Sequence, residues 1–475
     1  MPTGSTSHPC AAVKEACPPV SPHEETRFDP IDHLGGPKPQ DGIDPRLLFD
    51  PTVHRGVFHF PQGFLWGAAT SAHQVEGNNA NSDWWAWEQA DHVRFRSGAA
   101  CDHYRRYRDD FDLAKSLAHN AHRFSLEWSR IEPRPGEFSD EGLAHYGDVI
   151  DALVERGIEP VMTVHHFTLP RWLAEQGGWE AKGVEERFTR FVEKVADAYA
   201  GKVKWWITLN EPVVQVFKGY LIGQWPPGVQ SLPRALAVYR RLLRAHVLAY
   251  EIIHRRRADA MVSVAMHALA VSPCNPKRLL DQVSTAGRHY LFNQMFLKGL
   301  LDGSLWLPGQ FFEQLPMKRS LDFIGLNYYT RDFVHNTGLD LPGLIGNQCG
   351  LDHHERVGKR SSLGWEIYPE GLLEFLKLDA RFKLPILITE NGIATDDEDD
   401  RRLFLMLHIW QLSRALGLGI DVRGYLYWSL LDNFEWADGY DNARFGLIGV
   451  DFATQRRTVR PSALRYAELI AKNQL

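Results

Sequence analysis

Cysteine is scarce in this chain, and its spacing excludes the sites that cysteine usually builds. The 475 residues include five cysteines, at positions 10, 17, 101, 274 and 349. An odd number at wide intervals gives neither the framework of a disulfide-rich secreted domain nor the close pairs of a zinc motif. We therefore expect a protein of a reducing compartment, the cytoplasm.

Long hydrophobic runs and an excess of positive charge are also missing. No stretch reaches the roughly 18 apolar residues that a membrane helix needs, and the start shows no basic segment followed by an apolar run. The formal net charge is −6, so no basic excess is present to attract nucleic acid. These absences predict a soluble protein without a membrane or nucleic-acid partner, and they leave the oligomeric state open.

The motifs of several catalytic classes are absent. No HExxH helix motif for zinc, no GxSxG nucleophile elbow and no GxGxxG phosphate turn after a strand occurs in the sequence. We therefore expect no metal and no cofactor. Aromatic residues, in contrast, are plentiful, with 15 Trp and an aromatic fraction of 12%. Their rings fill cores and also stack on sugars, so composition alone leaves both uses open.

The pattern of the chain predicts a single barrel. Residues 1–57 are rich in Pro, Gly, Asp and His without apolar periodicity, which indicates an irregular N-terminal extension. From residue 58 to 475, strands and amphipathic helices alternate. Strands are expected to start near residues 64, 121, 159, 205, 262, 321, 385 and 422, and helices over 101–117, 146–156, 184–200, 233–257, 289–302, 370–378 and 401–416. Eight alternating units favour a closed (β/α)8 TIM barrel as one domain over an open doubly wound sheet.

Two of the predicted strands end in a carboxylate beside an amide. The stretch WWITLNEP (205–212) delivers Asn210 and Glu211, and the stretch LITENG (387–392) delivers Glu390. Carboxyl ends of barrel strands meet around one pocket, so these two carboxylates are expected to face each other. A pair of carboxylates is the arrangement that glycoside hydrolysis uses.

Polar and aromatic residues mark the same end of the other strands. Each alone has a structural explanation, such as a satisfied core histidine or an ion-pair partner, but together they predict a site at one end of the barrel. The strand ends and the loop after the eighth strand contribute Gln74, Arg123, His166, Asn327, Tyr329, Trp428, Asn433, Glu435 and Trp436.

From Phe60 to about Arg465 the chain resembles glycoside hydrolase family 1, a family of retaining β-glucosidases and β-galactosidases. The motifs that carry the resemblance are FLWGAATSAHQVEG (64–77), HRFSLEWSRIEP (122–133), TVHHFTLPRWL (163–173), TLNEP (208–212), GYLIGQWPPG (219–228), LDFIGLNYYTR (321–331), LITENG (387–392) and YLYWSLLDNFEWADGY (425–440). The resemblance implies the (β/α)8 fold independently of the strand count.

The resemblance also implies a role for each site residue. Glu211 matches the general acid/base, and Glu390 matches the nucleophile, supported by Arg123 and Tyr329. Asn210 would hold the sugar 2-hydroxyl. The remaining matches would form the sugar pocket, in which hydroxyls are held by Gln74, His166, Glu435 and Trp436, the ring stacks on Trp428, and Asn327 and Phe445 give support. The charge of Glu390 is expected to raise the pKa of Glu211, so that Glu211 holds a proton near neutral pH.

The function implied is a retaining exo-β-glycosidase, a β-glucosidase with some β-galactosidase or β-fucosidase activity, acting on small β-glycosides or oligosaccharides. Two alternatives remain at this point. A transglycosidase would use the same covalent intermediate with an acceptor alcohol in place of water, and a carbohydrate-binding protein would keep the pocket without turnover. The turn GYDNARFG (439–446) is longer by one residue than the family pattern, and residues before 58 have no family counterpart.

Overall fold

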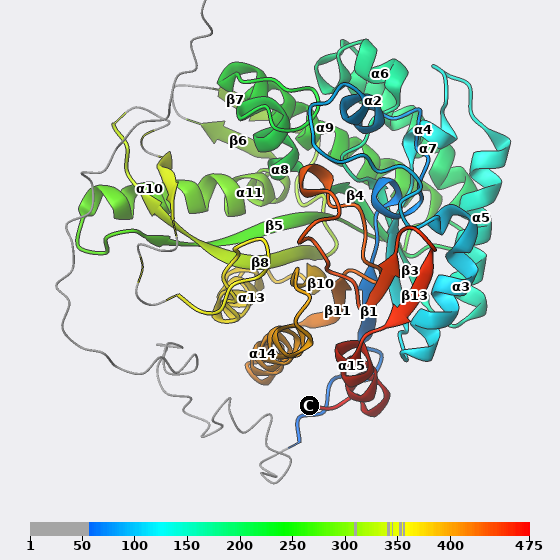
Figure 1. Ribbon diagram of the computed structural model, residues 1–475. Coiled ribbons are helices and arrows are strands. Elements are labelled where there is room, and N and C mark those ends of the chain that lie inside the picture. Colours follow the sequence, from blue (N-terminus) through cyan, green and yellow to red (C-terminus); the bar gives the residue numbers. More distant parts are fainter. Residues whose placement is uncertain (1–56, 308–310, 340–342, 344, 351–353, 355–356) are drawn as a thin grey trace, which may run out of the picture.

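The computed structural model describes residues 57–475 except 308–310, 340–342, 344, 351–353 and 355–356 (Figure 1). The expected N-terminal extension therefore lies outside the described residues. Eight parallel strands form the barrel, and β10 pairs with both β11 and β8, which closes the sheet. The barrel strands are β1 (Leu65–Ala69), β2 (Ala121–Ser125), β3 (Glu159–His165), β4 (Trp205–Asn210), β5 (Met261–Pro273), β8 (Ile324–His335), β10 (Ile386–Asn391) and β11 (Val422–Trp428). The predicted (β/α)8 barrel is confirmed.

Helices connect the strands and cover the outside of the barrel (Figure 1). The longer ones are α3 (His103–Ser116), α5 (Asp140–Glu155), α7 (Val184–Tyr199), α9 (Leu232–Arg256), α10 (Leu279–His289), α11 (Met295–Asp302), α13 (Glu370–Ala380), α14 (Glu398–Gly417) and α15 (Pro461–Lys472). Short helices are α1 (Ala72–Val75), α2 (Asp83–Gln89), α4 (Trp128–Ile131), α6 (Arg171–Glu175) and α8 (Pro212–Val216), with single turns at Gly178–Glu180, Phe217–Leu221, Tyr290–Gln294 and Trp436–Asp438. No helix in the described part of the chain is long and apolar enough to cross a membrane.

Small strands lie outside the closed barrel. β6 (Ser304–Leu307) pairs with β7 (Phe311–Gln314), β12 (Ile448–Asp451) pairs with β13 (Arg456–Val459), and β9 (Asn347–Cys349) adds to β8. Two predicted helices differ in extent. The helix expected over 146–156 begins at Asp140, because Ser139 caps its N-terminus through the Gly142 amide. The helix expected over 289–302 is preceded by α10, and one wide turn joins α10 to α11.

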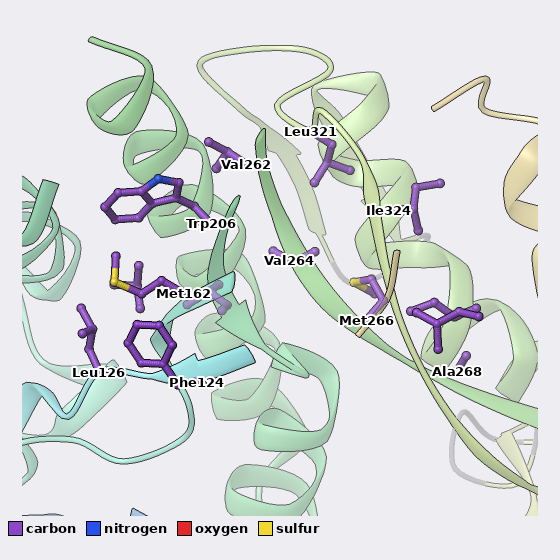
Figure 2. Close-up of a cluster of buried hydrophobic side chains, with 14 of the residues drawn as sticks. Phe124, Leu126, Met162, Trp206, Val262, Val264, Met266, Ala268, Leu321 and Ile324 are labelled. Atoms are coloured by element: carbon purple, nitrogen blue, oxygen red, sulfur yellow. The ribbon is translucent and has the colours of Figure 1, made fainter. Parts of the chain in front are cut away.

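Side chains along each strand point alternately into the barrel and outward to the helices, which gives two apolar layers. The inner layer fills the barrel with one or two side chains per strand, among them Ala121, Val161, Ile207, Ala265, Phe323, Leu387 and Leu426. The neighbouring residues point outward to the helices, as Figure 2 shows for Met162 and Trp206. These two residues are direct cross-strand partners, and Trp206 also pairs with Val262. The apolar inner layer leaves the carboxyl ends of the strands to polar residues.

Truncating Trp206 tests how strongly the outer layer stabilises the barrel. The side chain is 0% exposed and its indole nitrogen donates to the carbonyl of Val203. Trp206→Ala removes a large buried ring and leaves a cavity, so it is expected to cost about 3–5 kcal/mol of the free energy of unfolding. The midpoint of urea unfolding should fall accordingly, while Leu464→Ala, at a side chain that is 55% exposed, should leave it nearly unchanged.

Candidate active site

A cavity of about 670 Å³ opens among the residues that end or follow the barrel strands. Its walls include ten of the residues predicted from the sequence, namely Gln74, His166, Asn210, Glu211, Tyr329, Glu390, Trp428, Glu435, Trp436 and Phe445. Arg123 and Asn327 are almost wholly buried and contact the two glutamates, as described below. Asn433 is buried too and contacts Glu435. The structure thus brings every predicted site residue into one neighbourhood.

Irregular strand ends aim the two glutamates at the cavity. The pairing of β4 with β5 changes register between Ile207 and Asn210, and Glu211 follows with a positive φ of 40°. Strict alternation from the inward Ile207 would turn Asn210 away from the cavity. A bulge lets two consecutive residues, Asn210 and Glu211, both line it. The pairing of β10 with β8 has a similar shift just before Glu390.

Glu390 lies between a cation and a phenol. Arg123 Nη1 donates to Glu390 Oε1 at 2.5 Å, and Tyr329 Oη donates to Oε2 at 2.5 Å. Burial raises the pKa of the Glu390 carboxyl to about 7, although the Arg123 guanidinium favours its ionised form, and the nearby charge of Glu211 adds to the rise. Both oxygens are therefore held in place, and the ionised form exists near neutral pH.

His267 is a partner of Glu211 that the sequence pattern did not indicate. The two side chains approach to 3.3 Å between His267 Nδ1 and Glu211 Oε1, and Asn327 Nδ2 donates to the same oxygen at 3.0 Å. Burial favours the neutral carboxyl, but His267 and Asn327 outweigh it and lower the pKa of Glu211. This differs from the expected rise in pKa, because an imidazole rather than the charge of Glu390 dominates the surroundings of Glu211.

His267 and Glu211 form a pair that can hold one proton at either site. Burial opposes a charged imidazole, yet the charge of Glu211 outweighs it and raises the pKa of His267 above its ordinary value. A charged His267 beside an ionised Glu211 and a neutral His267 beside a protonated Glu211 have the same net charge and differ by one proton transfer. The pair therefore keeps a transferable proton next to the cavity, which is what an acid catalyst requires.

The strand boundary explains why His267 escaped notice. The sequence places His267 in the middle of a predicted strand, whereas the residues predicted for the site lie at strand ends. In the structure β5 runs on past the barrel to Pro273, and His267 is level with Asn327 on the neighbouring strand. One feature of the sequence could have indicated His267, namely an ionisable residue within an otherwise apolar strand.

Asn210 is fixed by two donors, Arg123 and Asn327, and by one acceptor, His166. Arg123 Nη2 donates to Asn210 Oδ1 at 2.6 Å, and Asn210 Nδ2 donates to His166 Nε2 at 3.1 Å. Burial, and then the charge of Arg123, hold the pKa of His166 well below its usual value, so this imidazole is neutral. The ring of His166 lies roughly parallel to those of Trp428 and Trp436, with centroids 5.9 Å and 6.1 Å away.

A second group of polar residues in the cavity surrounds Glu435. Gln74 Nε2 and Asn433 Nδ2 each donate to Glu435 Oε2 at 3.0 Å. Burial raises the pKa of Glu435 to about 8, although the hydrogen bond from Asn433 favours its ionised form. A carboxyl that titrates near neutral pH beside a fixed amide can both accept from and donate to a hydroxyl.

Loops and extensions add lining residues that strand positions could not predict. Trp225 packs on Trp436 at a centroid distance of 5.7 Å, and Trp365 packs on Tyr329 at 5.7 Å. Further lining comes from Lys218, Gln224, Arg288, Phe292, Asp332, Asn347, Gln348 and Asp438. These residues come from loops, from the end of α10, from the helical turns at Phe217–Leu221, Tyr290–Gln294 and Trp436–Asp438, and from the parts of β8 and β9 beyond the barrel. The sequence pattern does not determine how these segments approach the cavity.

Comparisons with known proteins agree on one family. The model of glycosyl hydrolase family 1 matches residues 57–475. Beta-glucosidase A of Thermotoga maritima is 33% identical over 452 residues, which covers 88% of this chain and 99% of that protein. The solved beta-glycosidase from Pyrococcus horikoshii is 38% identical, with a TM-score of 0.83 over 88% of this chain and 96% of that one.

A further solved structure is a beta-glucosidase from Thermotoga maritima in complex with glucoimidazole, 32% identical, with a TM-score of 0.80 over 88% of this chain and 100% of that one. The resemblance predicted from the motifs is confirmed. The chain is a glycoside hydrolase and belongs to glycosyl hydrolase family 1.

Proposed function

We propose that this protein is a retaining exo-β-glycosidase that removes terminal non-reducing β-D-glucosyl residues, with some activity toward β-galactosides and β-fucosides. The observation that carries the proposal is the pairing of two differently supported carboxyls in one cavity. Glu390 is held by Arg123 and Tyr329, whereas Glu211 lies 3.3 Å from the imidazole of His267. The relatives named as beta-glucosidases and beta-galactosidases support the choice of sugar.

In the first step, an oxygen of ionised Glu390 attacks the anomeric carbon and the bond to the leaving oxygen breaks. The proton of the Glu211–His267 pair goes to that oxygen, so the aglycone leaves as a neutral alcohol. Arg123 and Tyr329 hold the Glu390 carboxylate in position for attack. The product is a glycosyl ester of Glu390.

In the second step, water attacks the anomeric carbon and the ester bond to Glu390 breaks. Glu211 accepts the proton of the water, and the pair regains the charge state with which it began. Because Glu390 is neutral while esterified, it does not oppose ionised Glu211 during this step. Asn210, whose amide is fixed by Arg123 and His166, would bind the sugar 2-hydroxyl.

The remaining cavity residues would select the sugar. Gln74, His166, Glu435 and Trp436 would bind its hydroxyls and Trp428 would stack on its ring. Buried groups that await a hydroxyl penalise a sugar that lacks it, because they are then left unpaired. The experiment that tests the function is a panel of nitrophenyl β- and α-glycosides. Turnover of the β-glucoside is expected, and a panel without any β-glycosidase turnover would contradict the proposal.

Replacing His267 tests the proton-sharing pair. His267→Asn keeps a polar group beside Glu211 but leaves the proton on Glu211 alone. Since Glu211 raises the pKa of His267 above its ordinary value, the pair keeps its proton to a higher pH than Glu211 would by itself. The alkaline limb of the pH profile of kcat/KM for an alkyl β-glucoside should move to lower pH by about one unit.

A matched control separates this effect from a general loss of structure. His254→Asn alters another histidine–carboxylate pair, His254 with Asp322 at 2.8 Å, on the outer helix α9. Its pH profile should equal that of the unaltered enzyme. An unmoved alkaline limb in His267→Asn would show that Glu211 holds the working proton without help.

A further inference from the structure

Two thiols and an imidazole meet beside the cleft, apart from the glutamates. Cys274 Sγ and Cys349 Sγ lie 3.5 Å apart, and the ligand atoms of Cys274, Cys349 and His354 all lie within 4.8 Å of one another. These residues form the only such group of three or more potential metal ligands among the residues that the structure describes. The proposed hydrolysis uses none of them.

The extension of the barrel brings the two cysteines together from distant parts of the sequence. Strands β5 and β8 continue past the barrel as a long ribbon (Figure 1). Cys274 follows β5 directly, and its amide donates to the carbonyl of Val334 on β8 at 2.8 Å. Cys349 ends β9 and pairs with Phe333 on the other edge of β8. The backbones of both cysteines are thus hydrogen-bonded to the same strand, β8.

Packing also orients the third ligand. The imidazole of His354 stacks on the ring of Phe333, with centroids 3.7 Å apart and planes 13° from parallel. Phe333, Cys349 and Val357 form a small apolar cluster against which Cys274 packs. An apolar surround of this kind limits the access of water and strengthens the bond between a thiolate and a cation.

The chemistry of the three ligands selects the cation. Thiolate and imidazole together are typical ligands of zinc, whereas calcium and magnesium require oxygen. Two thiolates on one tetrahedral zinc, with Zn–S bonds of about 2.3 Å, lie roughly 3.8 Å apart. The observed 3.5 Å between the sulfurs needs only a small adjustment to reach that geometry.

We propose that Cys274, Cys349 and His354 bind one zinc ion, with water at the fourth position. The ion would hold β9 against the ribbon of β5 and β8. That placement matters for the cleft, because Gln348, next to Cys349, lines the cavity and donates to Asp332 Oδ1 at 2.8 Å. The zinc would therefore shape the wall of the cleft beyond the glutamates and leave the reaction itself unchanged.

Metal analysis of the full chain tests the site. Protein purified without chelator, then given zinc and desalted, should contain about one zinc per chain. Cys274→Ser and Cys349→Ser should each lower this to about a tenth or less. Cys101→Ser is the matched control, because Cys101 is buried elsewhere and donates to the carbonyl of Asp432, a bond that serine can keep. It should retain the zinc.

Cobalt gives a readout that needs no variant to fold. Unaltered protein loaded with Co²⁺ should show a thiolate-to-cobalt charge-transfer band that Zn²⁺ abolishes. Removing the zinc should raise KM for a cello-oligosaccharide at least about threefold while kcat for nitrophenyl β-glucoside stays the same. Absence of both the zinc and the cobalt band would overturn the proposal, as would a Cys274–Cys349 disulfide in protein alkylated at lysis. The zinc content and the cobalt band are independent of whether the chain hydrolyses β-glucosides.

Discussion

Replacing Glu390 by glutamine is expected to lower kcat for nitrophenyl β-glucoside by about 10⁴-fold or more. The glutamine amide has the shape of the carboxyl but does not form the glycosyl ester through which the proposed reaction passes. The single amide oxygen would still accept from Arg123, and the amide nitrogen could donate to the phenol oxygen of Tyr329, so the cavity should keep its form. Initial rates with purified variant, corrected for contaminating enzyme, give the measurement.

Glu370→Gln provides the matched control for this loss. Burial raises the pKa of Glu370 to about 7, and this residue begins helix α13 away from the lining of the cavity. The same chemical change there should leave kcat within about twofold. Turnover by Glu390→Gln close to that of the unaltered enzyme would rule out Glu390 as the nucleophile.

Replacing Glu211 by alanine should have the next largest effect, and its size should depend on the leaving group. For an alkyl β-glucoside, whose aglycone needs a proton to depart, kcat/KM should fall about 10³-fold. For dinitrophenyl β-glucoside, whose aglycone leaves as a stable anion, kcat/KM should fall much less. Without a base, hydrolysis of the ester on Glu390 should then limit kcat.

Azide distinguishes this mechanism from a general loss of activity. A small anion can enter the space vacated by the Glu211 side chain and attack the ester without a base. Added azide should therefore raise kcat of Glu211→Ala with dinitrophenyl β-glucoside and yield β-glucosyl azide, while the unaltered enzyme should show no such rise. An equal loss for both leaving groups, unaffected by azide, would contradict the acid/base assignment.

Most of the fold could be predicted because its determinants are local. Apolar runs of the length of a strand alternate with helical periodicity, and all eight predicted strands occur in the barrel. The predicted starts of helices were less accurate where a capping side chain outside the periodic pattern sets the start of the helix. Ser139 extends α5 at its start, and Asp397 caps α14 through two backbone amides.

The residues around the cavity were predicted because strand ends of a barrel converge. What the sequence did not reveal depends on register and on strand length. The bulges that aim Asn210 and Glu390 inward leave no mark in the residue pattern. His267 reaches Glu211 because β5 is longer than the barrel requires, and this contact reverses the expected direction of the pKa shift of Glu211.

The cysteines illustrate the same limit. Their intervals exclude any local zinc motif, since Cys274 and Cys349 are 75 residues apart. Only the pairing of β8 with β5 on one side and β9 on the other brings them together. Contacts set by tertiary pairing of distant strands are not encoded in spacing along one segment.

The most direct test of the central claim is to trap the intermediate on the enzyme. A 2-deoxy-2-fluoro-β-glucoside with a dinitrophenyl leaving group should inactivate the protein with time and add one fluoroglucosyl group per chain, because the fluorine slows hydrolysis of the ester more than its formation. Peptide mapping by mass spectrometry should locate the group on Glu390, within the segment LITENG. A label on any other residue, or no label at all while the ordinary glucoside is turned over, would contradict the proposed double displacement.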